Sequence, residues 1–211
     1  MQKRSGMLTL ANQITIFRIL LILPFVICML HVNDPEDGTF YRYTAVGIFA
    51  IQSISDALDG YLARMLKQVS RLGRFLDPLA DKLLMTCASI LLSVNATAIE
   101  GFRLPGSIVV CIIGKDVILT LGYTTTYFLT GRVKIRPVLA GKLSTFLQLS
   151  MVLSILIGPE VQKIFNLWVY VVQILWLLTA LAAILATIIY IRHGMQYINE
   201  FEQNTNNQDQ E

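Results

Sequence analysis

The stretch Ser55–Lys82, SDALDGYLARMLKQVSRLGRFLDPLADK, sets four aspartates among apolar residues: Asp56, Asp59, Asp77 and Asp81. A carboxylate at membrane depth costs about 2.5–3.5 kcal/mol on insertion scales. Four such groups close together would also repel one another. Protonation or a bound cation would relieve both costs. The stretch therefore indicates a functional site, and a metal site is the first hypothesis to test.

The composition around this stretch is that of a membrane protein. Of the 211 residues, 55% are hydrophobic and only 15% are charged, whereas soluble domains carry about 25% charged residues. The three cysteines, Cys28, Cys87 and Cys111, all fall in apolar runs, so neither a disulfide framework nor a zinc site is expected. We expect an all-α integral membrane protein with one domain over residues 1–194. The polar residues 195–211 are predicted to be a disordered tail.

Six apolar segments have about the 20 residues that a membrane-spanning helix needs. They lie at residues 11–32, 41–65, 75–94, 106–130, 138–157 and 167–191. The N-terminal segment and the connections at 66–74 and 131–137 are basic, and the other connections are acidic or nearly neutral. By the positive-inside rule, both termini and the two basic connections face the cytoplasm. The expected fold is a six-helix transmembrane bundle.

The aspartate spacing places each pair on one face of a helix. Asp56 and Asp59 are three residues apart, and Asp77 and Asp81 are four apart, which are the separations of neighbours on a helix surface. The connection between the two helices is short, so both pairs are expected near the cytoplasmic end of the bundle. The active site would then face the cytoplasm.

Carboxylate oxygens without nearby His or Cys suit a hard cation such as Mg²⁺ or Mn²⁺. Such an ion usually also takes phosphate oxygens as ligands. Arg64 follows the first pair, where its guanidinium could clamp a phosphate. The residues alone thus indicate metal-dependent phosphoryl-type transfer, in which a free carboxylate could deprotonate an incoming hydroxyl.

The same residues carry a resemblance to a known family. The run Asp56-x2-Asp59-Gly60-x2-Ala63-Arg64-x8-Gly73-x3-Asp77-x3-Asp81 resembles the signature of the CDP-alcohol phosphotransferase (CDP-alcohol phosphatidyltransferase) family at every position. The opening LANQITIFR and the six-helix layout are similar as well. The resemblance implies an enzyme that joins CDP-diacylglycerol to an alcohol and releases CMP, with Mg²⁺ or Mn²⁺ as cofactor.

The resemblance also implies roles for individual residues. Asp56, Asp59, Asp77 and Asp81 would hold the metal, and Asp81 would also act as the general base. The CDP-binding residues would be Asp56, Gly60, Ala63, Arg64 and Gly73. A homodimer within membrane lipids is expected, in the cytoplasmic membrane of a bacterium or an inner organelle membrane of a eukaryote. No nucleic-acid partner is expected.

The acceptor alcohol is left open between two branches of the family. The segment GKLSTFLQ resembles both the phosphatidylglycerophosphate synthase and the cardiolipin synthase branches, whereas Lys115-Asp116 and Ser144 depart from the former. Glycerol 3-phosphate is a dianion that needs two or more fixed cations, for which the candidates are Lys115, Arg132, Arg136 and Lys142. We favour glycerol 3-phosphate. The alternatives are phosphatidylglycerol as acceptor and, more remotely, a non-enzymatic transporter or scaffold, since transporters also use intramembrane aspartates.

Overall fold

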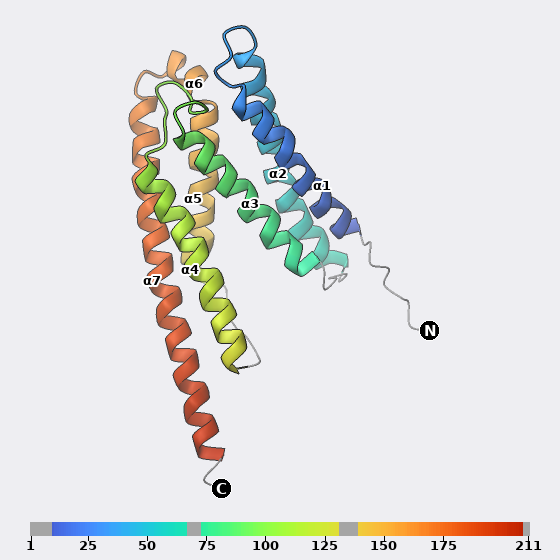
Figure 1. The fold of residues 1–211 in the computed structure, drawn as a ribbon, viewed down its shortest axis with the longest axis vertical. Helices are drawn as coiled ribbons and strands as arrows, with labels where there is room; N and C mark the ends of the chain where they lie inside the picture. Colours follow the sequence, from blue (N-terminus) through green and yellow to red (C-terminus); the bar gives the residue numbers. More distant parts are fainter. Residues whose placement is uncertain (1–9, 67–72, 131–138, 209–211) are drawn as a thin grey trace. The chain divides into compact units, whose positions relative to one another are not determined.

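The computed structural model describes the backbone of residues 10–66, 73–130 and 139–208, with side chains chiefly within 15–55, 79–122 and 139–196. These described residues form helices and no strand (Figure 1). The helices are α1 (Leu10–Leu30), α2 (Gly38–Leu66), α3 (Gly73–Ser93), α4 (Gly106–Thr130), α5 (Leu139–Leu156), α6 (Gly158–Ile164) and α7 (Trp168–Gln208). The all-helical prediction is confirmed for this part of the chain.

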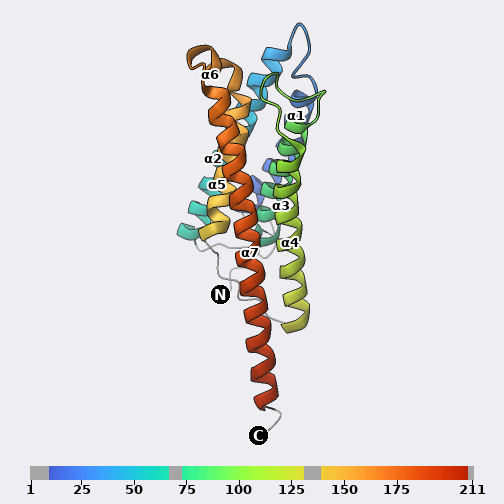
Figure 2. The same ribbon diagram turned by 90° about the vertical axis from the view of Figure 1, so that its left-hand side faces the viewer.

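The six predicted segments correspond to α1, α2, α3, α4, α5 and α7, with bounds that agree within three residues except at the end of α7. Two differences stand out. The connection after α5 contains the short α6, which has Pro159 in its first turn, a position where the missing N–H costs nothing. We predicted a disordered tail from residue 195, but α7 continues as a helix to Gln208 (Figure 2).

Among the described residues, three helical segments are long and apolar enough to cross a membrane: Gly106–Thr126, Leu139–Leu156 and Trp168–Gln196. A shorter apolar segment covers Thr15–Leu30 in α1. The other two long helices, α2 and α3, contain the charged residues of the aspartate motif. The described chain is thus rich in apolar helices, as expected, while the count of six spans stays a prediction.

The chain divides into two compact units. The first comprises residues 1–105 and 152–172, and so contains α1, α2, α3 and α6. Within it, α1 packs against both α2 and α3. The buried face of α1 includes Ile22, Phe25 and Met29, and the rings of Phe25 and Phe49 lie 6.1 Å apart between centroids. This packing fixes α1 beside both aspartate-bearing helices.

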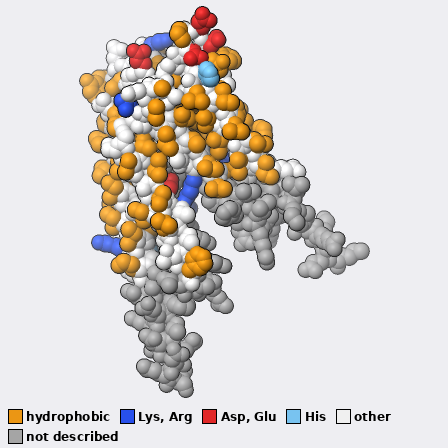
Figure 3. Space-filling view, viewed as in Figure 1, with side chains coloured by type: hydrophobic (Ala, Val, Ile, Leu, Met, Phe, Trp, Pro, Cys, Tyr) orange, Lys and Arg blue, Asp and Glu red, His pale blue; other side chains and the backbone are white. Residues whose placement is uncertain are grey.

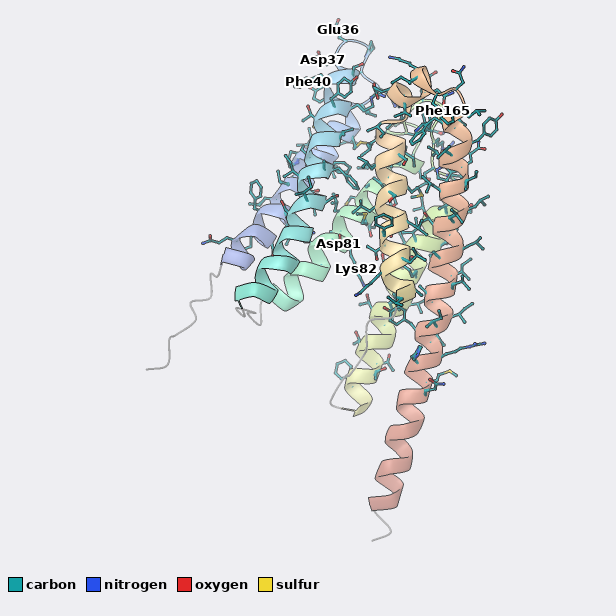
Figure 4. All side chains as sticks on the ribbon, turned by 180° about the vertical axis from the view of Figure 1, so that it is seen from behind. Glu36, Asp37, Phe40, Asp81, Lys82 and Phe165 are labelled. Carbon is teal, nitrogen blue, oxygen red and sulfur yellow. The ribbon has the colours of Figure 1, made fainter. Side chains whose placement is uncertain are left out.

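Polar contacts close one end of this first unit. The Asn33 side chain donates hydrogen bonds to the carbonyl oxygens of Ala96 and Ala98, at 3.0 and 3.1 Å. Arg42 in α2 forms an ion pair with Glu160 in α6, and the Tyr43 hydroxyl also donates to that carboxylate at 3.0 Å. Figure 4 shows Glu36 and Asp37 at this end of the helices and Asp81 well away from it along α3.

The second unit comprises residues 106–151 and 173–211, which form α4, most of α5 and most of α7. In it, Tyr190 of α7 lies directly over Gly141 of α5: a Cβ atom on Gly141 would stand 2.6 Å from the tyrosine Oη. The remaining faces of α7 expose large apolar side chains, among them Leu177, Leu181 and Leu185. Figure 3 shows hydrophobic side chains spread over the visible surface, as expected for a protein surrounded by lipid.

Candidate active site

The first aspartate pair lies in α2, on the continuation of that helix's buried face. Arg42, Ala45, Phe49 and Gln52 are all buried, and they follow one another at intervals of three or four residues. Continuing these intervals leads to Asp56, Asp59 and Ala63, with Gly60 beside them, because a helix repeats every 3.6 residues. By spacing, the aspartate pair therefore continues the stripe of α2 whose described members, up to Gln52, are buried.

The second pair lies in α3 in the same manner. Asp81 is half-buried and shares a stripe with the buried residues Leu84, Met85 and Ala88. Asp77 stands one turn before Asp81, on the same stripe. Gly73 is the first residue of α3 and Arg64 lies in the last turn of α2. The side chains of all the motif residues except Asp81 are outside the described part of the structure.

Helix α1 contributes buried polar groups beside these two helices. Thr15 and Arg18 lie on its buried face, with Arg18 only 3% exposed. Gln52 of α2, four residues before Asp56, donates from its amide nitrogen to the carbonyl oxygen of Arg18 at 2.9 Å. Gln52 was not predicted from the sequence. The one available signal was its spacing, because an amide four residues before Asp56 shares the helix face of the aspartates.

The motif residues fit a divalent metal by their chemistry and by their placement. Four carboxylates are hard oxygen donors of the kind that Mg²⁺ and Mn²⁺ prefer. They belong to two consecutive helices, both packed on α1. Among the described side chains, no group of three or more His, Cys, Asp or Glu residues could hold a metal ion. A metal site at the aspartate motif stays a prediction.

Among the acceptor-binding candidates, Lys115 is placed inside the second unit. Its side chain is buried in α4, and its ammonium group donates to the Ser144 hydroxyl of α5 at 3.4 Å. It also lies 3.5 Å from an oxygen of Asp116. Adjacent helix residues do not face each other. The long lysine side chain makes the contact nonetheless.

The other candidates are not brought to Lys115 in the described part of the chain. Lys142 is exposed on α5, two residues from Ser144, which places it about 200° around the helix from the side that Lys115 approaches. Arg132 and Arg136 lie outside the described residues. Of the four acceptor candidates, the structure thus describes the buried Lys115 and the exposed Lys142, and the acceptor pocket itself stays a prediction.

The described chain is all-helical and rich in apolar segments, and two of its consecutive helices carry the aspartate motif, which is compatible with a membrane-embedded enzyme. Comparison with known proteins identifies the family. A family model described as CDP-alcohol phosphatidyltransferase matches residues 8–188, and the chain belongs to this family. The family is generally dependent on a divalent metal ion. The predictions of the family and of a transferase are confirmed.

The relatives fall into the two branches suggested by the sequence. A Bacillus subtilis CDP-diacylglycerol–glycerol-3-phosphate 3-phosphatidyltransferase is 36% identical over 159 residues, 72% of this chain and 78% of the relative. A Rickettsia typhi protein of the same name is 28% identical over 178 residues, 84% of this chain and 93% of the relative. The human cardiolipin synthase (CMP-forming) is 31% identical over 172 residues, 73% of this chain and 54% of the relative.

Proposed function

We propose that this protein transfers the phosphatidyl group of CDP-diacylglycerol to glycerol 3-phosphate, forming phosphatidylglycerophosphate and CMP. The similarity to the Bacillus subtilis relative, at 36% identity over most of both chains, carries the proposal. The buried ammonium group of Lys115 supports it, because a dianionic acceptor needs fixed cations.

The proposed reaction is a displacement at phosphorus. A hydroxyl oxygen of glycerol 3-phosphate bonds to the phosphorus that carries diacylglycerol, and the bond from that phosphorus to the CMP oxygen breaks. Asp81 takes the proton of the attacking hydroxyl, acting as a general base. Its half-buried position on the inward stripe of α3 is compatible with this role.

Asp56, Asp59, Asp77 and Asp81 are proposed to hold Mg²⁺ or Mn²⁺, which when bound screens and polarises the phosphate oxygens. In the same proposal, Arg64 binds the phosphates of CDP as a bidentate cation. Gly60, Ala63 and Gly73 keep the helix surfaces open to the nucleotide, because none has a side chain larger than a methyl group. Asp56 also contributes to the CDP side of the site.

The setting of the reaction is also part of the proposal. Six spans, cytoplasmic termini and a site near the cytoplasmic ends of α2 and α3 follow from the basic connections. On this basis, soluble glycerol 3-phosphate would reach the site from the cytoplasm and CDP-diacylglycerol from the surrounding lipid. The protein would act as a homodimer.

Phosphatidylglycerol is the second candidate acceptor, because the human cardiolipin synthase is 31% identical over 73% of this chain. The test is CMP release by purified protein given CDP-diacylglycerol with Mg²⁺ or Mn²⁺ and either acceptor. Release with glycerol 3-phosphate alone is the expected result. Release with phosphatidylglycerol alone would replace the proposed function by cardiolipin synthesis.

A further inference from the structure

Gln52 stands where the interior of the first unit meets the aspartate motif. It is 1% exposed, and it is the last described residue on the inward stripe of α2 before Asp56. One helical turn separates the two, so their Cβ atoms lie about 5–6 Å apart. A side chain at this position can influence the first aspartate pair directly.

The hydrogen bond to Arg18 fixes which way the Gln52 amide points. The Arg18 carbonyl oxygen, 2.9 Å away, can only accept, so the glutamine nitrogen must face α1 and its oxygen must point elsewhere. The same bond holds the turn of α1 that contains Arg18 against α2.

No described residue donates a hydrogen bond to the Gln52 oxygen. Its Oε1 atom is buried and has no hydrogen bond to any described residue. An unpaired buried acceptor destabilises the folded protein by about 1–3 kcal/mol. Buried polar groups in proteins are therefore nearly always paired. A donor supplied by a ligand would remove the cost.

We propose that Gln52 is a positioning residue of the aspartate site: its nitrogen holds α1 on α2 one turn from Asp56, and its oxygen accepts a hydrogen bond from a water of the hydrated divalent ion. Mg²⁺ and Mn²⁺ sites of this type keep several waters, each an O–H donor. Groups that act behind the ligands in this way strengthen metal binding about 10–100-fold. The inference rests on the proposed function, since it requires a metal at the aspartates.

The test is direct binding of Mn²⁺ to the detergent-solubilised apoprotein, followed by the electron paramagnetic resonance signal of free Mn²⁺. Gln52→Met keeps the length of the side chain and removes both polar atoms. We expect the Mn²⁺ affinity to fall about 10-fold. The thermal unfolding midpoint of the metal-free protein should change little, because a hydrogen bond and an unpaired acceptor are lost together.

Gln148→Met is the matched control. Gln148 is a 2% exposed glutamine in α5 of the second unit, and its Nε2 is likewise unpaired among the described residues. This variant should bind Mn²⁺ as the wild type does. Gln52→Leu provides a second variant should Gln52→Met fail to fold.

The possible results distinguish a failure of the proposed role of Gln52 from a failure of the proposed function. Wild-type Mn²⁺ affinity in Gln52→Met or Gln52→Leu would overturn the inference and leave the proposed function standing. A lower unfolding midpoint with unchanged Mn²⁺ affinity would reduce Gln52 to a packing residue and overturn it too. A wild-type protein that neither binds Mn²⁺ nor releases CMP would overturn both.

Discussion

Lys115 places an ammonium group in the interior of the second unit, with only 5% of the residue exposed. A charge in that position is costly unless it is paired or binds an anion. Its two neighbours, the Ser144 hydroxyl at 3.4 Å and an Asp116 oxygen at 3.5 Å, are both long contacts for hydrogen bonds. The ammonium group is therefore held between α4 and α5 by two long contacts, and its proposed role in binding a phosphate can be tested.

Lys115→Met tests that capacity. If Lys115 binds the phosphate of glycerol 3-phosphate, its loss should raise the KM for that acceptor by about 10-fold or more, equivalent to about 1.4 kcal/mol or more of lost binding. The KM for CDP-diacylglycerol should not change. The measurement is initial CMP release at varied acceptor concentration.

Lys142→Met provides the comparison, because Lys142 carries the same charge on the exposed side of α5. We expect it to change the KM for glycerol 3-phosphate by less than Lys115→Met does. Equal effects of the two substitutions would mean that general attraction of the anion, rather than a specific contact with Lys115, sets the KM.

Asp81→Asn tests the general base. Asparagine keeps an oxygen in the same place but cannot take up a proton, so turnover should fall by about 10²–10⁴-fold. Mn²⁺ should still bind measurably, since three carboxylates are retained. Single-turnover CMP release and Mn²⁺ titration would distinguish the two effects, with the exposed Asp37→Asn as the control. Turnover at the wild-type rate would rule out Asp81 as the base.

At the scale of helices, the contact between α5 and α7 depends on the absence of a side chain at Gly141. A methyl group there would lie 2.6 Å from the Oη of Tyr190 and 3.1 Å from its Cε2. Gly141→Ala should therefore destabilise the protein by about 1–3 kcal/mol, the usual effect of overfilling a packed site. Thermal unfolding in detergent would measure it.

Two further variants make this prediction specific. Tyr190→Phe removes the atom nearest to the added methyl group, so Gly141→Ala should cost less in that background, which a double-mutant cycle would register as coupling. Gly122→Ala in α4 meets nothing within 4 Å and should be neutral or slightly stabilising, because alanine favours helix. A similar loss in Gly141→Ala and Gly122→Ala would contradict the predicted clash.

The helices were predictable from sequence because long apolar runs are interrupted by short polar connections. Their packing was not, because α1 is apolar on all sides: Phe25 is buried while Phe17, Leu23 and Ile27 are exposed. Hydrophobicity cannot distinguish such faces when the surroundings are lipid rather than water. The short α6 also escaped prediction, since its seven residues carry no repeating apolar pattern.

The candidate site was predictable to the extent that charge in an apolar sequence is conspicuous. The four aspartates and Lys115 were proposed as site residues in this way. Gln52 was not recognised, because neutral polar side chains are common in apolar helices, and Ser144 was noted only as a departure from one branch of the family. Folding supplies their partners, which are the Arg18 carbonyl group for Gln52 and the Lys115 ammonium group for Ser144.

At the scale of the whole molecule, the positive-inside rule makes a prediction about sidedness. With the native cysteines replaced by alanine, Asp37→Cys in an acidic connection should react with a membrane-impermeant maleimide from one side of sealed vesicles. Lys134→Cys and Gln210→Cys should react only from the other side. An even number of spans requires both termini on one side, and Lys134 lies in a basic connection that the charge rule assigns to that side. Labelling of Asp37→Cys and Gln210→Cys from the same side would rule out six spans and would remove the reason for placing the aspartate site on the cytoplasmic face.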